Sequence, residues 1–276
     1  MKNQEKPRYQ RSSGKHAYIN APPKPRNIFK YSYKKIRRAY ERYHADGFMG
    51  VMRWIKFLAR IKMRDLRFYL AYHLYYKFKT PYHFLYRNKK YQQFWKNYNA
   101  TWLNERTVEI PIIMEIIQSH HGKRILEVGN VLSNYFSVTH DILDKYDSAF
   151  GVIRRDVVNF NPEEKYDLVV SISTLEHVGF DETPKDPKKT LEAIRNLKMN
   201  CLDKNGKMVI TFPLGYNIHL DGMIERKELE FDTINFLKRI NKKNQWKEVS
   251  WDEARGERYN SPFPFANVVV ICEATR

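Results

Sequence analysis

The sequence has few cysteines and no long apolar run. Cys201 and Cys272 are its two cysteines, and they provide neither a disulfide framework nor a CxxC metal or redox pair. We expect both to be small buried apolar residues in a reducing compartment. The longest stretch without a charged side chain, Tyr259–Cys272, has fourteen residues and two prolines. A membrane-spanning helix needs about 20 apolar residues, so none is predicted, and the charged first residues predict no signal peptide.

Acidic residues are scarce in the first hundred positions. Residues 1–100 contain 25 Lys and Arg against 4 Asp and Glu, whereas residues 101–276 contain 24 against 27. The first hundred residues also hold 23 of the 40 aromatic side chains. This shift predicts a boundary near residue 100. We expect a disordered basic tail over 1–27, a basic aromatic-rich helical extension over 28–100, and a nearly neutral domain over 101–276.

Within the extension, two helical patterns, 28–43 and 50–79, lie on either side of Asp46 and Gly47. In the second pattern apolar residues recur at spacings of three to five, and most basic residues fall between them. Three interpretations stay open for residues 50–79: a helix that packs on the following domain, a helix that lies on an anionic membrane surface, and a nucleic-acid-binding helix. A basic amphipathic pattern does not separate these partners.

The segment Lys123–Phe136 reads KRILEVGNVLSNYF. Its apolar start predicts a short strand that ends in an acid and a glycine. Gly129 would let the backbone turn and leave room for a ligand, and residues 130–138 would form a helix whose first N–H groups face the same crevice. The segment resembles motif I of the class I S-adenosylmethionine-dependent methyltransferases. It keeps Glu127 and Gly129 but has Val131 and Ser133 where later glycines usually stand. The resemblance implies an S-adenosylmethionine site that includes Glu127, Gly129 and Asn130.

Two further acids follow at distances that suit this family. A strand predicted at 139–143 ends at Asp144, and in nucleotide-binding crevices an acid about 20 residues past the glycine turn bonds the ribose. A strand predicted at 150–154 precedes Asp156 and Val157, which the resemblance places near the adenine. About six residues separate Asp144 from Phe150, so either the usual crossover helix is trimmed or the strand at 139–143 is misplaced.

The segment Lys165–Val178, KYDLVVSISTLEHV, predicts a central parallel strand ending near Ile172, which completes the expected cofactor crevice. Its Leu-Glu-His-Val end is similar to the ubiquinone-biosynthesis O-methyltransferases. Those enzymes place a metal-binding glutamate where this chain has Ser173, so no metal is predicted. The resemblance makes His177 a candidate general base beside Glu176. A histidine that bonds the backbone at a helix start is the alternative.

The rest of the chain completes an alternation of strands and helices. We expect helices at 187–202 and 228–240, a strand at 207–212, and strands at 246–251 and 266–274 that form an antiparallel end hairpin. The predicted fold is α/β: a doubly wound, mostly parallel Rossmann-like methyltransferase sheet with an antiparallel terminal hairpin, preceded by the basic helical extension. Before the first strand, Glu105 and Arg106 are either a helix-start ion pair or lid contacts to a ligand.

These observations favour an S-adenosylmethionine-dependent methyltransferase that O-methylates a small-molecule, glycan or lipid-linked acceptor. No Asn/Asp-Pro-Pro-aromatic tetrad follows the central strand, which disfavours amino methylation of nucleic-acid bases. The alternatives are a methyltransferase-fold binding protein without activity and a nucleic-acid-binding methyltransferase that uses the basic extension. We expect a cytoplasmic protein, with the membrane surface as a further possible site.

Overall fold

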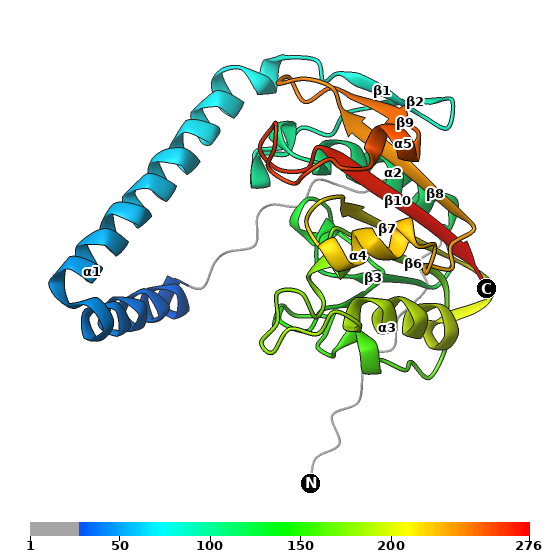
Figure 1. Cartoon of the computed structure of the whole chain (residues 1–276), viewed down its shortest axis with the longest axis horizontal. Coiled ribbons are helices and arrows are strands. Elements are labelled where there is room, and N and C mark those ends of the chain that lie inside the picture. The colour runs from blue at the N-terminus through cyan, green and yellow to red at the C-terminus, as the bar shows by residue number, and fades with distance from the viewer. Residues whose placement is uncertain (1–27) are drawn as a thin grey trace, which may run out of the picture.

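The computed structural model describes residues 28–276, with side chains described from residue 47 onward (Figure 1). The predicted tail lies outside the described residues. The helices are α1 (Ile28–Leu74), α2 (Arg106–Ser119), α3 (Lys189–Asn196), α4 (Ile218–Glu225) and α5 (Trp251–Ala254). The strands are β1 (His83–Tyr86), β2 (Lys89–Gln92), β3 (Ile125–Val128), β4 (Asp141–Leu143), β5 (Val152–Ile153), β6 (Tyr166–Ile172), β7 (Leu202–Pro213), β8 (Thr233–Arg239), β9 (Trp246–Val249) and β10 (Val268–Thr275).

One eight-stranded sheet runs in the order β5-β4-β3-β6-β7-β10-β8-β9. Its first five strands are parallel, β10 is antiparallel to both of its neighbours, and β9 is antiparallel to β8. The predicted mostly parallel sheet with an antiparallel end is therefore confirmed. The connection from β4 to β5 contains no helix, as the short spacing after Asp144 required.

Helices cover both faces of this sheet. One core layer packs β6 and its neighbours against α3 and α4, and the other packs the opposite strand faces against α2 (Figure 1). Alternation along β6 sends Val169 to the first layer and Leu168 and Val170 to the second. Cys201 and Cys272 are buried free thiols of the first layer, as predicted, and burial raises the pKa of Cys201 to about 11.

Two helices predicted from the sequence are wrong. Residues 130–138 contain one short 3-10 turn, Leu132–Asn134, and the Glu127 carboxylate accepts the N–H groups of Val131 and Leu132. Residues 228–240 contain β8 instead of a helix, since this segment pairs with both β10 and β9. Pairing with other strands decides whether such a short apolar segment becomes a strand or a helix. The spacing of its apolar residues alone does not decide this.

The pairing within the antiparallel end also differs from the expected one. The sequence predicts a hairpin between the segments 246–251 and 266–274, but their strands, β9 and β10, are not neighbours. β8 and β9 form the terminal hairpin, and β10 enters between β7 and β8. Residues 83–92 form a separate hairpin, β1-β2, whose Phe84 and Tyr86 pack in the α2 layer of the core.

Helix α1 projects from the sheet domain as an arm (Figure 1). Gly47 adopts a left-handed φ of 62° inside it, so the predicted interruption at Asp46 and Gly47 is confirmed as a kink. At the other end of the arm an aromatic cluster holds it to the domain. The rings of Tyr72 and Tyr76 stack on Trp102 with centroids 5.3 and 4.9 Å away.

We predict that Trp102→Ala lowers the free energy of unfolding by about 3–5 kcal/mol, because Trp102 is 2% exposed and its removal leaves a cavity under the arm. Denaturant unfolding of the full chain measures the change. Phe150→Ala removes a fully exposed ring and is the matched control, with an expected change within about 0.5 kcal/mol. Equal effects for the two variants would show that the aromatic cluster does not anchor α1.

Candidate active site

A cavity of about 250 Å³ lies at the carboxyl ends of the parallel strands. The loops after β3, β4, β5 and β6 each contribute to its wall, as expected for a ligand crevice in an open α/β sheet. Its lining residues are Val128, Gly129, Leu143, Asp144, Lys145, Tyr146, Arg155, Asp156, Val157, Thr174, His177, Val178 and Glu182. A larger hollow, of about 480 Å³, lies beside α3 and α4 and is lined by none of the predicted site residues.

Gly129 makes the turn from β3 into this cavity. Its φ of 87° is left-handed, and a Cβ there would lie 2.1 Å from Thr174 Oγ1. The turn therefore requires glycine, both for its backbone conformation and for its close approach to the loop after β6. Glu127 lies fully buried below the turn, where it also bonds His140 Nε2 at 2.8 Å. Glu127 shapes the loop and does not line the cavity.

Asp144 faces the cavity from the end of β4. Its Oδ1 accepts the N–H groups of Tyr146 and Asp147 at 2.8 Å each. Its Oδ2 accepts a longer bond of 3.3 Å from the Asn130 N–H, which leaves capacity for another donor. The Asn130 side chain donates to Asp147 and accepts from the Ser133 hydroxyl, so it links the loop after β3 to the loop after β4.

Charged residues surround Asp156, which lies in the cavity wall. Lys145 and Lys189 each bridge Asp156 and Glu182, with N–O distances between 2.5 and 3.0 Å. Burial opposes ionisation of Asp156, but its hydrogen bonds from Lys189 and Lys145 outweigh that effect and lower its pKa to about 2. The apolar side chain of Val157 follows in the cavity wall.

His177 is held by an acid that the sequence analysis did not single out. Its Nδ1 lies 2.6 Å from Asp181 Oδ2, and the same oxygen accepts the Tyr216 hydroxyl at 2.7 Å. Burial opposes ionisation of Asp181, but bonds from Tyr216 and His177 lower its pKa below the usual value. A carboxylate only accepts, so Nδ1 carries a hydrogen, and in the neutral imidazole the lone pair is then on Nε2. This arrangement makes Nε2 available as a base.

Two further predicted site residues, Glu176 and Ile172, are buried and do not line the cavity. Glu176 is 1% exposed, its Oε1 lies 3.7 Å from His177 Nε2, and its Oε2 has no hydrogen-bond partner among the described residues. Burial raises the pKa of Glu176 well above its usual value, which favours the protonated carboxyl. Ile172 is fully buried in the α2 layer of the core and does not line the cavity.

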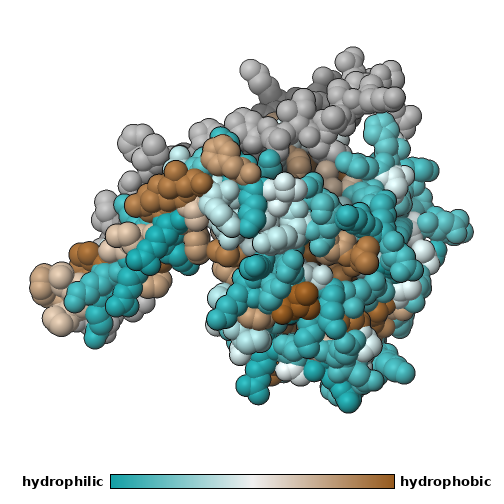
Figure 2. All heavy atoms as spheres, turned by 90° about the horizontal axis from the view of Figure 1, so that it is seen from above, coloured by the Kyte–Doolittle hydropathy of each residue, from teal (hydrophilic) through white to brown (hydrophobic). Residues whose placement is uncertain are grey.

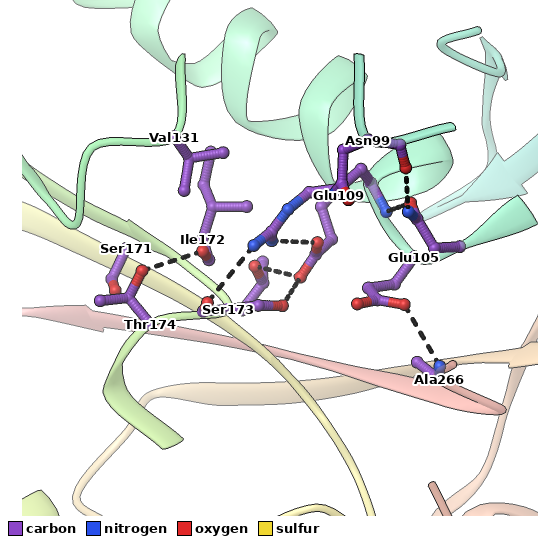
Figure 3. A network of polar contacts seen from close by, with 12 residues as sticks. Asn99, Glu105, Glu109, Val131, Ser171, Ile172, Ser173, Thr174 and Ala266 are labelled. Carbon is purple, nitrogen blue, oxygen red and sulfur yellow. Dashed lines mark hydrogen bonds and ion pairs between the residues drawn. The ribbon is translucent and has the colours of Figure 1, made fainter. Parts of the chain in front are cut away.

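A buried polar network joins α2 to the ends of β6 and β7 (Figure 3). One carboxylate oxygen of Glu109 accepts the hydroxyls of Ser173 and Thr211 at 2.6 and 2.7 Å. Its other oxygen pairs with Arg106 at 2.7 Å. Arg106 also donates to the Ser173 carbonyl at 3.4 Å. The network fixes Ser173, which has a strained φ of 36°, at the start of the loop that carries His177.

Arg106 is thus an ion-paired residue at the start of α2, and it lies close to the loop after β6. Burial alone would lower the pKa of Arg106, but the carboxylates of Glu109 and Glu105 raise it. Glu105 accepts the Ala266 N–H at 3.2 Å and links α2 to the segment before β10 (Figure 3). Neither residue lines the cavity. Among residues 47–276, whose side chains the structure describes, no group of three or more His, Cys, Asp or Glu is arranged to hold a metal ion.

Two patterns in the sequence point to residues beside this cavity that the sequence analysis did not single out. Asp181 stands four residues after His177, which is a spacing that brings side chains together in a helical turn. Lys145 directly follows Asp144, and its partners Asp156 and Glu182 follow later strands. The i,i+3 spacing of Arg106 and Glu109 is local, but nothing local marks the contacts of Glu109 with Ser173 and Thr211, which are 64 and 102 residues away.

No protein-family model matches the chain, and no curated protein matches it. Several solved structures resemble it. N-methyltransferase NodS from Bradyrhizobium japonicum, in complex with S-adenosyl-L-homocysteine, is 12% identical over 60% of this chain and 84% of its own, with a TM-score of 0.38. A TehB-like S-adenosylmethionine-dependent methyltransferase from Corynebacterium glutamicum is 18% identical over 59% and 86%, with a TM-score of 0.33. An rRNA methylase from Escherichia coli is 13% identical over 62% and 65%, with a TM-score of 0.33.

The sheet itself has the strand directions and the switch-point cavity of an open α/β fold. The chain has a Rossmann-like α/β fold, with helices on both faces of its sheet. Five of the predicted site residues line one cavity, namely Gly129, Asp144, Asp156, Val157 and His177. The other four, Glu127, Asn130, Ile172 and Glu176, do not line it. The closer resemblance of residues 175–178 to ubiquinone-biosynthesis enzymes stays a prediction.

We predict that Glu109→Gln destabilises the protein by about 3–5 kcal/mol, because it leaves the Arg106 guanidinium buried without its counter-charge. Denaturant unfolding measures this change. Glu115→Gln is the control on the same helix. Glu115 pairs with Lys89 at the surface, and we expect a change within about 0.5 kcal/mol. A small effect at both positions would mean that the network contributes little to holding α2.

Proposed function

We propose that the protein is an S-adenosylmethionine-dependent methyltransferase that methylates a hydroxyl group of a small-molecule, glycan or lipid-linked acceptor. The observation that carries this proposal is the meeting of Gly129, Asp144 and His177 at one cavity. Gly129 provides the close backbone approach, Asp144 provides an acceptor for ribose hydroxyls, and His177 provides a base.

The residues around the cavity fit S-adenosylmethionine. Val128, Leu143, Val157 and Val178 provide apolar walls on which an adenine ring can lie. Only glycine lets the turn pack against Thr174 without a clash, and Gly129 itself lines the cavity, where a ligand can approach the main chain. When bound, S-adenosylmethionine supplies an electrophilic methyl group on its sulfonium sulfur.

The chain's own residues would then position the acceptor and remove its proton. Asp181 and Tyr216 hold the His177 ring so that Nε2 keeps its lone pair. His177 Nε2 would accept the proton that the acceptor hydroxyl loses on methylation. Most of the acceleration comes from holding the two reactants in line. His177 contributes by general base catalysis, which typically adds about 10²–10⁴-fold.

One observation favours a second function, that of a binding protein with a methyltransferase fold and no activity. Glu127 occupies the N–H groups of Val131 and Leu132, so the loop after Gly129 has fewer donors for a ligand than a free helix start would have. Such a protein would bind S-adenosylhomocysteine and transfer no methyl group. Turnover with a hydroxyl acceptor separates the two functions.

We predict that Asp144→Ala weakens S-adenosylhomocysteine binding by about 1.5–3 kcal/mol, which is the range for a hydrogen bond to a charged group. Isothermal titration measures the affinity. Asp203→Ala removes an exposed acid at the opposite end of the sheet and is the control, with unchanged affinity. Absence of any binding to the wild type at millimolar ligand would contradict the proposed function.

We predict that His177→Ala lowers kcat by about 10²–10⁴-fold and leaves cofactor affinity nearly unchanged. Asp181→Asn should lower kcat as well, because an amide no longer fixes the Nδ1–H tautomer. Methyl transfer from labelled S-adenosylmethionine to a hydroxyl acceptor is the measurement. Wild-type turnover in His177→Ala would make His177 a structural residue.

A further inference from the structure

Helix α1 carries side chains that the sheet domain does not cover. Between residues 50 and 74 only Gly50 is buried, and the contacts of the arm with the domain lie near its end, at Phe68, Tyr72 and Tyr76. Hydrophobic and hydrophilic side chains lie next to each other along the projecting arm, seen at the left of Figure 2. The interpretation that this helix packs its apolar face on the domain therefore holds for its last turns alone.

The exposed part of α1 is divided lengthwise into two stripes. The apolar stripe consists of Ile55, Met63, Leu66 and Leu70, which recur at helical spacing and are 44–53% exposed. The basic stripe lies beside it and consists of Arg53, Lys56, Arg60, Arg64 and Arg67, also three or four residues apart. Residues 50–74 contain one acid, Asp65, against six basic side chains.

These two stripes match the surface of a lipid bilayer, where charged headgroups lie beside apolar acyl chains. Lys and Arg are attracted to anionic lipid headgroups, while the neighbouring apolar side chains can enter the boundary with the acyl chains. Residues 50–74 would extend about 36 Å along such a surface at a rise of about 1.5 Å per residue. No helix among the described residues is long and apolar enough to cross a membrane, so α1 would lie on the surface.

We propose that α1 is a docking helix that places the protein on an anionic membrane surface through the apolar and basic stripes of residues 53–70. Nucleic acid would use the basic stripe but would leave the four apolar side chains in water, so the membrane explains both stripes. The aromatic cluster around Trp102 would then hold the sheet domain next to the membrane-bound helix. This proposal does not depend on the methyltransferase activity.

The test uses the full chain and sedimentation with two kinds of vesicle, phosphatidylcholine alone and phosphatidylcholine mixed with phosphatidylglycerol. We expect binding to the anionic vesicles, weakened by salt, and little binding to the neutral ones. Arg60→Gln with Arg67→Gln should reduce the partition coefficient at least about 30-fold, since each basic residue near the surface contributes about 1 kcal/mol. The control, Lys204→Gln with Lys243→Gln, removes two exposed charges from the sheet domain and should change it less than about 3-fold.

A second pair of variants tests the apolar stripe. Leu66→Gln with Leu70→Gln keeps good helix formers and should reduce binding at least about 100-fold, because two leucine side chains lose their apolar environment. Circular dichroism and S-adenosylhomocysteine titration show whether each variant keeps its helix and its cavity. Absence of vesicle binding by the wild type overturns the proposal. Binding that the α1 variants retain also overturns it, as does a stable dimer or nucleic-acid complex that uses α1 while vesicles stay unbound.

Discussion

The buried carboxylate of Glu109 is the contact on which the geometry of the site depends. It joins α2 to the carboxyl ends of β6 and β7 through Ser173 and Thr211, and it balances the charge of Arg106. A buried charge is tolerated only when its partners are all in place, so this network allows one arrangement of the strand ends. The loop that begins at Ser173 then brings Thr174 against Gly129 and His177 to the cavity.

Two kinds of acid lie in and beside the cavity. Burial raises the pKa of Glu176 and outweighs the opposing effects of a backbone hydrogen bond and Arg106, whereas the hydrogen bonds that Asp156 and Asp181 accept lower the pKa of each. The charged form is therefore favoured for Asp156 in the cavity wall and for Asp181 beside His177. The basic side chains of α1 lie on a separate arm, so the protein can carry a strong positive charge without placing it in the site.

The sequence allowed the parallel half of the sheet to be predicted, because apolar runs that end in Gly129, Asp144 or Ser173 have few alternative structures. The antiparallel half was harder. Residues 233–239 have a composition that also suits a helix, and pairing with β10 decided the outcome. The role of Glu109 at the strand ends had no local signal, because Ser173 and Thr211 follow it by 64 and 102 residues. Long-range polar contacts of this kind arise only when the fold brings the strand ends together.

We propose that the cavity between Gly129 and Asp156 holds S-adenosylmethionine. A crystal structure with S-adenosylhomocysteine is the decisive test. We expect the ribose hydroxyls within hydrogen-bond distance of Asp144, the adenine ring beside Val157, and the sulfur atom on the side of the cavity where His177 lies. Ligand density in another hollow of the protein, or none at a saturating concentration, would contradict it.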